Sequence, residues 1–224
     1  MAKRQLKNKI LRQDTLYVWD LAQTLFREDW DSRKTGAPTY GDWLARKLDK
    51  KFNQIKPREY EMGHRIPYRS GWHFNLDLQP GFKEVLSWTK HNEVFTTGVP
   101  QQIGWRAEYL GKKYGFDLKK YFQKINSTFD YGETNVKTEK MLADFLKGKF
   151  LSGYRSIVYV DDRLDNLRSF RRAVAENRQS LPGLAVRLYH ILNDVSGCRT
   201  RRGYFSVGTL YDLLDNEKKI INNH

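Results

Sequence analysis

Two short hydrophobic runs in this chain each stop abruptly at aspartate. The run Thr15–Trp19 is followed by Asp20, and the run 155–160 is followed by Asp161 and Asp162. Short runs rich in β-branched and aromatic residues are typical of strands buried on both faces of a parallel sheet. Such a sheet binds its ligands beyond the carboxyl ends of its strands. The two runs therefore predict an α/β fold with a functional site at one edge of the sheet.

Strands and helices are expected to alternate along most of the chain. Further strands are predicted at residues 93–97, 121–125 and 183–189, and helices at 82–91, 101–114, 138–147 and 209–216. Alternation of this kind describes a doubly wound parallel sheet with helices on both faces. A chain of 224 residues is too short for two large domains, so we expect one core.

The segment 26–75 interrupts this alternation. Only 40–55 within it has the spacing of an amphipathic helix, and the rest mixes aromatic with charged residues. We therefore expect three regions: a basic N-terminal arm at 1–13, a core at 14–25 and 76–224, and an insertion at 26–75.

The composition narrows the class of protein. No apolar run approaches the roughly 20 residues that cross a bilayer, and the N-terminus lacks the apolar block of a secretory signal. The single cysteine, Cys198, has no partner for an intramolecular disulfide. We therefore expect a protein of the cytoplasm or another reducing compartment, with no membrane partner. The net charge of +14 favours an anionic partner such as nucleic acid or a ribonucleoprotein, although an ordinary basic surface also explains it.

Polar residues from several predicted strands should meet at one edge of the sheet. Asp20, Asp161 and Asp162 would lie there with Thr97, which ends the strand 93–97, and with Lys137, which precedes a helix. Three adjacent carboxylates repel one another unless a hard cation or protons compensate, so the cluster predicts a Mg²⁺ site. The structural alternative for Asp161 and Asp162 is a pair of helix-capping acids.

The order of these residues resembles the four motifs of the haloacid dehalogenase-like (HAD) superfamily. The matching pieces are Asp-x-x-x-Thr-Leu from Asp20, Thr97 with Gly98, Lys137 before a helix, and Asp161-Asp162-x-x-x-Asn166. The resemblance covers residues 15–215 apart from the insertion. It implies a Rossmann-like HAD core, with the insertion as a cap over the site. Thr96 and Lys140 compete with Thr97 and Lys137 for their motif positions.

The resemblance also implies a role for each residue. Asp20 would attack phosphorus and form an aspartyl-phosphate, while Thr97, Gly98 and Lys137 would bind the phosphoryl oxygens. Mg²⁺ would be held by Asp20, Asp161, Asp162 and the backbone carbonyl of Ala22.

Ala22 departs from the phosphatase pattern of this superfamily. Phosphatases carry a second aspartate there, which protonates the leaving group, and its absence should cost about 10²–10⁴-fold in rate. One explanation is a leaving group that needs no such proton: the phosphonoacetaldehyde hydrolase branch has alanine there and uses a cap lysine. The others are a substitute from the insertion, such as His64, or a fold kept only for binding. Candidates for the cap lysine are Lys47, Lys50, Lys51 and Lys56.

Two functions follow from these residues. The first is a Mg²⁺-dependent hydrolase of a phosphorylated substrate, weak or specialised because of Ala22. The alternative is a catalytically silent module that binds nucleic acid or a ribonucleoprotein through its basic surface. Candidate polyanion-binding residues are Arg163, Arg168, Arg171 and Arg172. The aromatic residues of the insertion, interleaved with Arg58, Arg65 and Arg69, either stack on bases or, as we favour, form a small satellite core.

Overall fold

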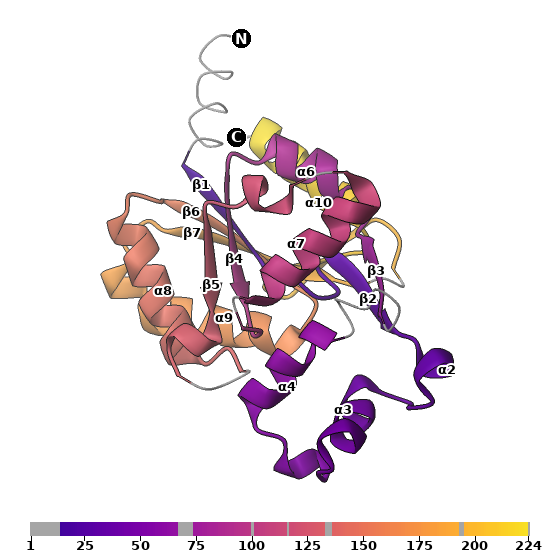
Figure 1. Cartoon of the computed structure of the whole chain (residues 1–224). Coiled ribbons are helices and arrows are strands. Elements are labelled where there is room, and N and C mark those ends of the chain that lie inside the picture. Colours follow the sequence, from indigo (N-terminus) through magenta and orange to yellow (C-terminus); the bar gives the residue numbers. More distant parts are fainter. Residues whose placement is uncertain are drawn as a thin grey trace.

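The computed structural model describes residues 14–66, 74–99, 101–115, 117–132, 136–192 and 195–223. These residues form an α/β fold in which helices flank a seven-stranded sheet (Figure 1). The strands are β1 (Thr15–Trp19), β2 (Phe26–Trp30), β3 (Phe74–Leu78), β4 (His91–Thr96), β5 (Lys124–Ser127), β6 (Ser156–Asp161), β7 (Ala185–Ile191), β8 (Cys198–Arg201) and β9 (Tyr204–Val207). The helices are α2 (Ser32–Thr35), α3 (Tyr40–Leu48), α4 (Pro57–Gly63), α6 (Phe82–Trp88), α7 (Gln101–Tyr114), α8 (Glu139–Leu151), α9 (Leu164–Glu176) and α10 (Leu210–Asn223). The predicted N-terminal arm lies outside the described residues.

The sheet is mostly parallel, as expected. Its strand order is β5-β4-β1-β6-β7-β9-β8, and within it only β8 runs antiparallel to its neighbour. The chain builds β4 and β5 on one side of β1 and then crosses over to build β6, β7 and β9 on the other. Ligands of open parallel sheets bind beyond the carboxyl ends of the strands where the order reverses. In this Rossmann-like sheet that place is the end of β1.

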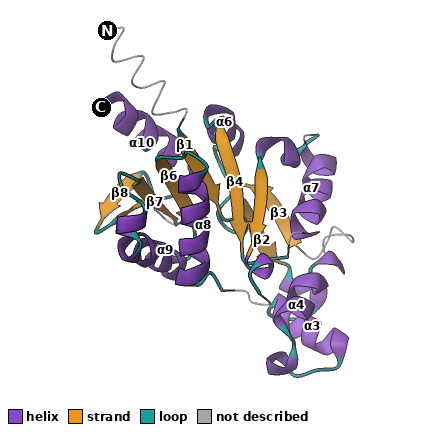
Figure 2. Cartoon of the chain, turned by 90° about the vertical axis from the view of Figure 1, so that its left-hand side faces the viewer, coloured by secondary structure: helices purple, strands orange, loops and turns teal. Residues whose placement is uncertain are grey.

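The side chains of β1 alternate between two cores, one on each face of the sheet. Tyr17 and Trp19 belong to the core covered by α6, α7 and α10, whereas Leu16 and Val18 belong to the core covered by α8 and α9 (Figure 2). Every residue of β1 is buried, which is the environment of a central strand. The run from Thr15 is hydrophobic without alternation because both faces are covered.

A hairpin forms the root of the insertion. The strands β2 and β3 pair antiparallel over five residues, from Phe26 opposite Leu78 to Trp30 opposite Phe74. The helices α2, α3 and α4 come between them in the chain and extend away from the sheet (Figure 1). This hairpin was not predicted, because its two strands are far apart in sequence and carry charged residues.

Aromatic side chains of the insertion pack on one another. The ring of Tyr40 lies 5.6 Å from that of Trp30 and 4.9 Å from that of Tyr60, and Trp43 packs beside them. Tyr40 and Trp43 are buried and continue the core beneath α6 and α10. These rings are therefore used in packing, but they join the main core on that face of the sheet, whereas a separate satellite core was expected. Arg69 lies outside the described residues.

Several predicted boundaries were wrong. The helix predicted at 40–55 ends at Leu48, because Asp49 adopts a left-handed conformation with φ 51°. The helix predicted at 82–91 ends at Trp88, where the Thr89 hydroxyl donates to the Val85 carbonyl (2.9 Å). The strand predicted at 121–125 lies three residues later, as β5. The last helix, α10, is longer than predicted, and β8 and β9 were not foreseen.

In the described part of the chain, no helix combines the length and the apolar character needed to cross a bilayer.

Candidate active site at the carboxyl ends of the central strands

Asp20 lies directly after the last residue of β1, at the edge where the strand order reverses. Its backbone N–H donates to the Val160 carbonyl (2.9 Å), so it continues the pairing of β1 with β6 by one step. The chain then makes a tight turn in which the Leu25 N–H donates to the Leu21 carbonyl (2.9 Å), and Gln23 has a φ of 58°. This turn holds Asp20, a residue that is only 7% exposed, at the carboxyl ends of the strands.

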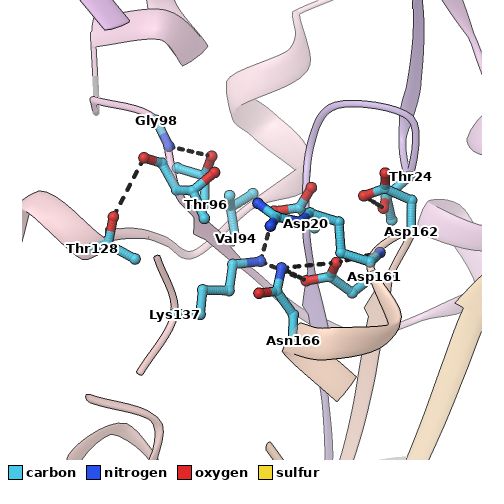
Figure 3. A network of polar contacts seen from close by, with 12 residues as sticks. Asp20, Thr24, Val94, Thr96, Gly98, Thr128, Lys137, Asp161, Asp162 and Asn166 are labelled. Carbon is cyan, nitrogen blue, oxygen red and sulfur yellow. Dashed lines mark hydrogen bonds and ion pairs between the residues drawn. The ribbon is translucent and has the colours of Figure 1, made fainter. Parts of the chain in front are cut away.

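Lys137 connects two of the predicted site carboxylates. Its Nζ lies 2.6 Å from Asp20 Oδ1 and 2.7 Å from Asp161 Oδ2, and its side chain is completely buried (Figure 3). Burial alone would lower the pKa of Lys137, but Asp161 and Asp20 together raise it above its usual value. The ammonium group therefore stays charged between the carboxylates. Lys140, the competing candidate, is exposed.

Asp161 receives more hydrogen bonds than the other site carboxylates. Its oxygens accept from Lys137, from the Tyr159 hydroxyl (2.7 Å), from Asn166 Nδ2 (3.1 and 3.0 Å) and from the Arg163 backbone N–H (2.8 Å). The Arg163 contact is the helix-capping role considered as an alternative. The contacts with Tyr159 and Asn166 are not part of helix capping. They hold the carboxylate in the orientation in which it pairs with Lys137.

Asp162 is half-buried and holds its carboxylate near Thr24. Its Oδ1 lies 3.5 Å from the Thr24 hydroxyl, and its backbone carbonyl accepts from His190 Nε2 (2.8 Å). Burial, followed by the charges of Asp20 and Asp161, raises the pKa of Asp162 to about 7. Burial also raises the pKa of Asp20 to about 6, despite the opposing charge of Lys137. Both carboxylates thus lie where ionisation is unfavourable without a further positive charge.

The three carboxylates fit a small divalent cation. One oxygen from each of Asp20, Asp161 and Asp162 lies within 4.8 Å of the others. Mg²⁺ binds carboxylate and carbonyl oxygens at about 2.0–2.1 Å, so modest adjustment would let them share one ion. Three carboxylates and one ammonium leave a formal charge of −2, which a dication balances. The carbonyl of Ala22, two residues beyond Asp20, is the further ligand that the HAD resemblance implies.

The two threonine candidates at the end of β4 have different surroundings. The Thr96 hydroxyl is buried and accepts from the Gly98 N–H (3.1 Å), whereas Thr97 is half-buried and lines a cavity. The Ser127 hydroxyl donates to the Gly98 carbonyl (2.6 Å), and the Thr128 hydroxyl donates to the Thr97 carbonyl (3.3 Å). Figure 3 shows this loop beside Lys137 and apart from Asp162. The geometry favours Thr97 as the residue that faces a ligand.

A cavity of about 540 Å³ lies between the insertion and the sheet edge. The core contributes Thr97 and Arg163 to its walls, and the insertion contributes the rest. Those residues of the insertion are Phe52, Asn53, Ile55, Tyr60 and Glu61. Its volume is within the range of about 300–1,000 Å³ found for pockets that take small-molecule ligands. The insertion therefore faces Thr97 and Arg163 at the carboxyl ends of β4 and β6.

The candidate substitutes for the missing aspartate are not among the described residues that line this cavity, and neither is Asp20 itself. Among the described residues its walls include neither His64 nor the proposed cap lysines. Burial, followed by the charge of Arg106, holds the pKa of His64 well below its usual value, so this imidazole is neutral. Lys50 pairs with Glu59 at 2.7 Å, and Lys47 lies over the Trp43 ring.

The four arginines predicted to form one polyanion-binding cluster have different neighbours. Arg163 lines the cavity, and Arg172 pairs with Glu139 of α8 at 3.0 Å. Arg168 pairs with Asp165 at 3.2 Å, and the Arg171 guanidinium donates to the Arg202 carbonyl (3.1 Å) beyond β8. Arg172 thus points toward α8, while Arg171 points toward β8 and β9.

Two features of the site were missed from the sequence. Tyr159 lies two residues before Asp161 on the same face of β6, so strand alternation was a usable signal for their hydrogen bond. The second feature is a buried ion pair between Arg106 of α7 and Glu28 of β2, which ties the hairpin to the core. No local pattern identifies it, because 78 residues separate its partners.

No family model, curated protein or solved structure matches this chain. A Rossmann-like sheet hosts many unrelated activities, so the fold by itself does not specify a function. The geometry around Asp20 is the feature that bears on function.

Proposed function

We propose that the protein is a Mg²⁺-dependent phosphohydrolase of the HAD type, with Asp20 as its nucleophile. The observation that supports this most strongly is the position of Asp20 at the end of the central strand. There Lys137 holds one of its oxygens at 2.6 Å, with Asp161 and Asp162 beside it. A scaffold without chemistry has no need for three clustered carboxylates, which cost stability when they ionise together.

The proposed reaction has two displacements at phosphorus. Lys137 binds Asp20 Oδ1, so Oδ2 is the oxygen that forms a bond to phosphorus while the ester P–O bond breaks. A water molecule then attacks phosphorus and the bond to Asp20 breaks. One proton of the water leaves with phosphate, and the other neutralises the alkoxide released in the first step. Mg²⁺ bound by the carboxylates would offset the repulsion between Asp20 and the phosphoryl oxygens. Lys137 and Thr97 bind those oxygens as charge builds on them.

Ala22 restricts which substrates turn over quickly. Its methyl group cannot protonate a departing alkoxide. In the described part of the chain neither His64 nor a proposed cap lysine lines the cavity, and the carboxyl group that does line it, Glu61, belongs to the insertion. Acyl phosphates and aryl phosphates have leaving groups that are stable as anions, so they need little proton transfer. We therefore propose slow hydrolysis of alkyl phosphate esters and faster hydrolysis of acyl and aryl phosphates.

A phosphate-release assay with acetyl phosphate, p-nitrophenyl phosphate and a panel of alkyl phosphates tests this function. Release should require Mg²⁺ and disappear in Asp20→Asn, while Asp165→Asn retains it, because Asp165 lies on the exposed surface of α9. Beryllofluoride with Mg²⁺ should form an adduct on Asp20, visible by ¹⁹F NMR. A panel with no Mg²⁺-dependent release, together with no adduct, refutes the proposal and favours the silent binding module.

A further inference from the structure

Arginine and lysine are segregated along this chain. Between residues 150 and 217 there are ten arginines and no lysine, whereas the remaining residues contain nine arginines and 21 lysines. The arginine-only segment builds β6, α9, β7, β8 and β9, which is the half of the sheet beyond β1. A guanidinium binds phosphate through two parallel N–H groups, and an ammonium acts as a point charge. Arginine is therefore densest in the half of the sheet that contains β6, β7, β8 and β9.

The arginines of β8 lie on one face of the sheet. All four residues of β8 are exposed, and its register places Arg201 opposite Tyr204 and Arg199 opposite Ser206. Tyr204 packs against the core covered by α8 and α9. Because directly opposed residues share a face, Arg199 and Arg201 lie on the side of the sheet that α9 covers.

The helix α9 and the turn between β8 and β9 bring further arginines to the same place. Arg168, Arg171 and Arg202 line a cavity of about 170 Å³, together with leucines and Tyr204. The Arg171 guanidinium donates to the Arg202 carbonyl (3.1 Å) and lies against Gly203, whose φ of +90° favours glycine. The turn and the helix are thereby held together. We call the resulting surface the arginine face; it comprises Arg163, Arg168, Arg171, Arg199, Arg201 and Arg202.

The arginine face begins at the candidate active site. Arg163 lines the large cavity, and the next residue, Leu164, lines the small one. A row of paired residues also crosses the sheet from Asp161 through His190 and Ser206 to Arg199. Neighbouring strands are about 4.8 Å apart, so Arg199 lies about 14 Å from Asp161 along this row. A chain of phosphates can therefore contact both places at once.

We propose that the arginine face binds the backbone of a single-stranded nucleic acid whose terminal phosphate enters the site at Asp20. This rests on the proposed function and specifies its substrate class. A flexible strand end suits the site, because Asp20 is only 7% exposed and the adjoining cavity has the size for a small ligand. Repeated phosphates match several guanidinium groups along one surface. A membrane is disfavoured, because among the described residues no large exposed hydrophobic side chain lies on α9, β8 or β9.

Fluorescence anisotropy with an internally labelled 12-nucleotide single strand tests the arginine face without requiring catalysis. The test variant is Arg199→Ala/Arg201→Ala, and the matched control is Lys218→Ala/Lys219→Ala. The control removes the same charge from exposed positions of α10, which covers the opposite face of the sheet. The test variant should bind at least tenfold more weakly. It should also show a salt dependence shallower by about 1.4 in log–log slope, since each lost phosphate contact in a single strand contributes about 0.7. The affinity of the control variant for the oligonucleotide should stay within about threefold of that of wild type.

Equal weakening of both variants would overturn the arginine face, because it would show a response to net charge alone. Tighter binding of polyglutamate or anionic vesicles than of the oligonucleotide would overturn the choice of nucleic acid. The last measurement is phosphate release from a terminally phosphorylated oligonucleotide, which wild type should catalyse. Hydrolysis of p-nitrophenyl phosphate without oligonucleotide binding would overturn this inference and leave the proposed function standing. Site-specific binding without release from any phosphate compound would overturn the proposed function and leave the docking surface standing.

Discussion

Replacing Lys137 with methionine tests the electrostatics of the candidate site directly. Methionine has a similar length and no charge, so Lys137→Met removes the ammonium group that lies 2.6 Å from Asp20 and 2.7 Å from Asp161. Removing one partner of a buried ion pair costs about 3–5 kcal/mol, because the other charge remains buried without compensation. A chain of this length loses about 2–4 °C in Tm per kcal/mol. A loss of about 4 kcal/mol therefore lowers Tm by roughly 8–16 °C.

The loss of Tm in Lys137→Met should be larger at high pH than at low pH. At pH 8 Asp20 and Asp162, with pKa values of about 6 and about 7, are ionised. Lys137→Met should then show its full loss of stability, because no ammonium group compensates these charges. At pH 5.5 these carboxylates are largely protonated, so Lys137→Met should cost less. Thermal unfolding followed by circular dichroism in EDTA at both pH values measures the difference.

The matched control for this experiment is Lys140→Met, three residues away on the exposed surface of α8. Exposed substitutions of this kind usually change stability by at most about 0.5 kcal/mol, so its Tm should stay within about 2 °C of wild type. If Lys137→Met melts as close to wild type as Lys140→Met does, the assigned role of Lys137 as a buried counter-charge is wrong. Added Mg²⁺ should recover part of the Tm that Lys137→Met loses.

Three further predictions concern other residues. Ala22→Asp should raise kcat for alkyl phosphates by about 10²–10⁴-fold, as measured by phosphate release, because it restores a proton donor. Metal-free wild type should lose about 1.4 kcal/mol of stability through Asp20 between pH 5 and 8. Its raised pKa, about 6, means that at pH 5 the folded state retains a proton that the unfolded chain has released, and this proton is lost as the pH rises through 6. Melting in EDTA should show this trend, and Mg²⁺ should remove it. Glu217→Gln should lower the free energy of unfolding in urea by about 3 kcal/mol, because the buried Glu217 carboxylate accepts from Arg187 (2.8 and 2.9 Å) and from Tyr17 (2.9 Å).

The sequence was most informative where burial imposes a pattern. Strands β1 and β6 are buried on both faces, so they read as continuous hydrophobic runs, and the aspartates that follow them were placed correctly at the sheet edge. The ends of the helices were less predictable. Asp49 stops α3 through a left-handed backbone conformation that no periodicity reveals.

The elements that the sequence did not predict are those with weak or non-local signals. Strand β8 is exposed along its whole length, so it has no hydrophobic pattern and reads as a charged loop. Strands β2 and β3 pair with each other across the entire insertion, and their register depends on tertiary packing. The distinction between Thr96 and Thr97 likewise needs the positions of Gly98 and Ser127 in space.

The buried pair of Glu28 and Arg106 has a consequence for how the cavity is built. The five paired residues join β2 to β3, and the ion pair anchors this base of the insertion to α7. The base of the insertion is thus fixed to the core independently of the aromatic packing around Tyr40 and Trp43. The walls that the insertion gives the cavity and the spacing of the carboxylates at Asp20, Asp161 and Asp162 are therefore set by separate parts of the molecule.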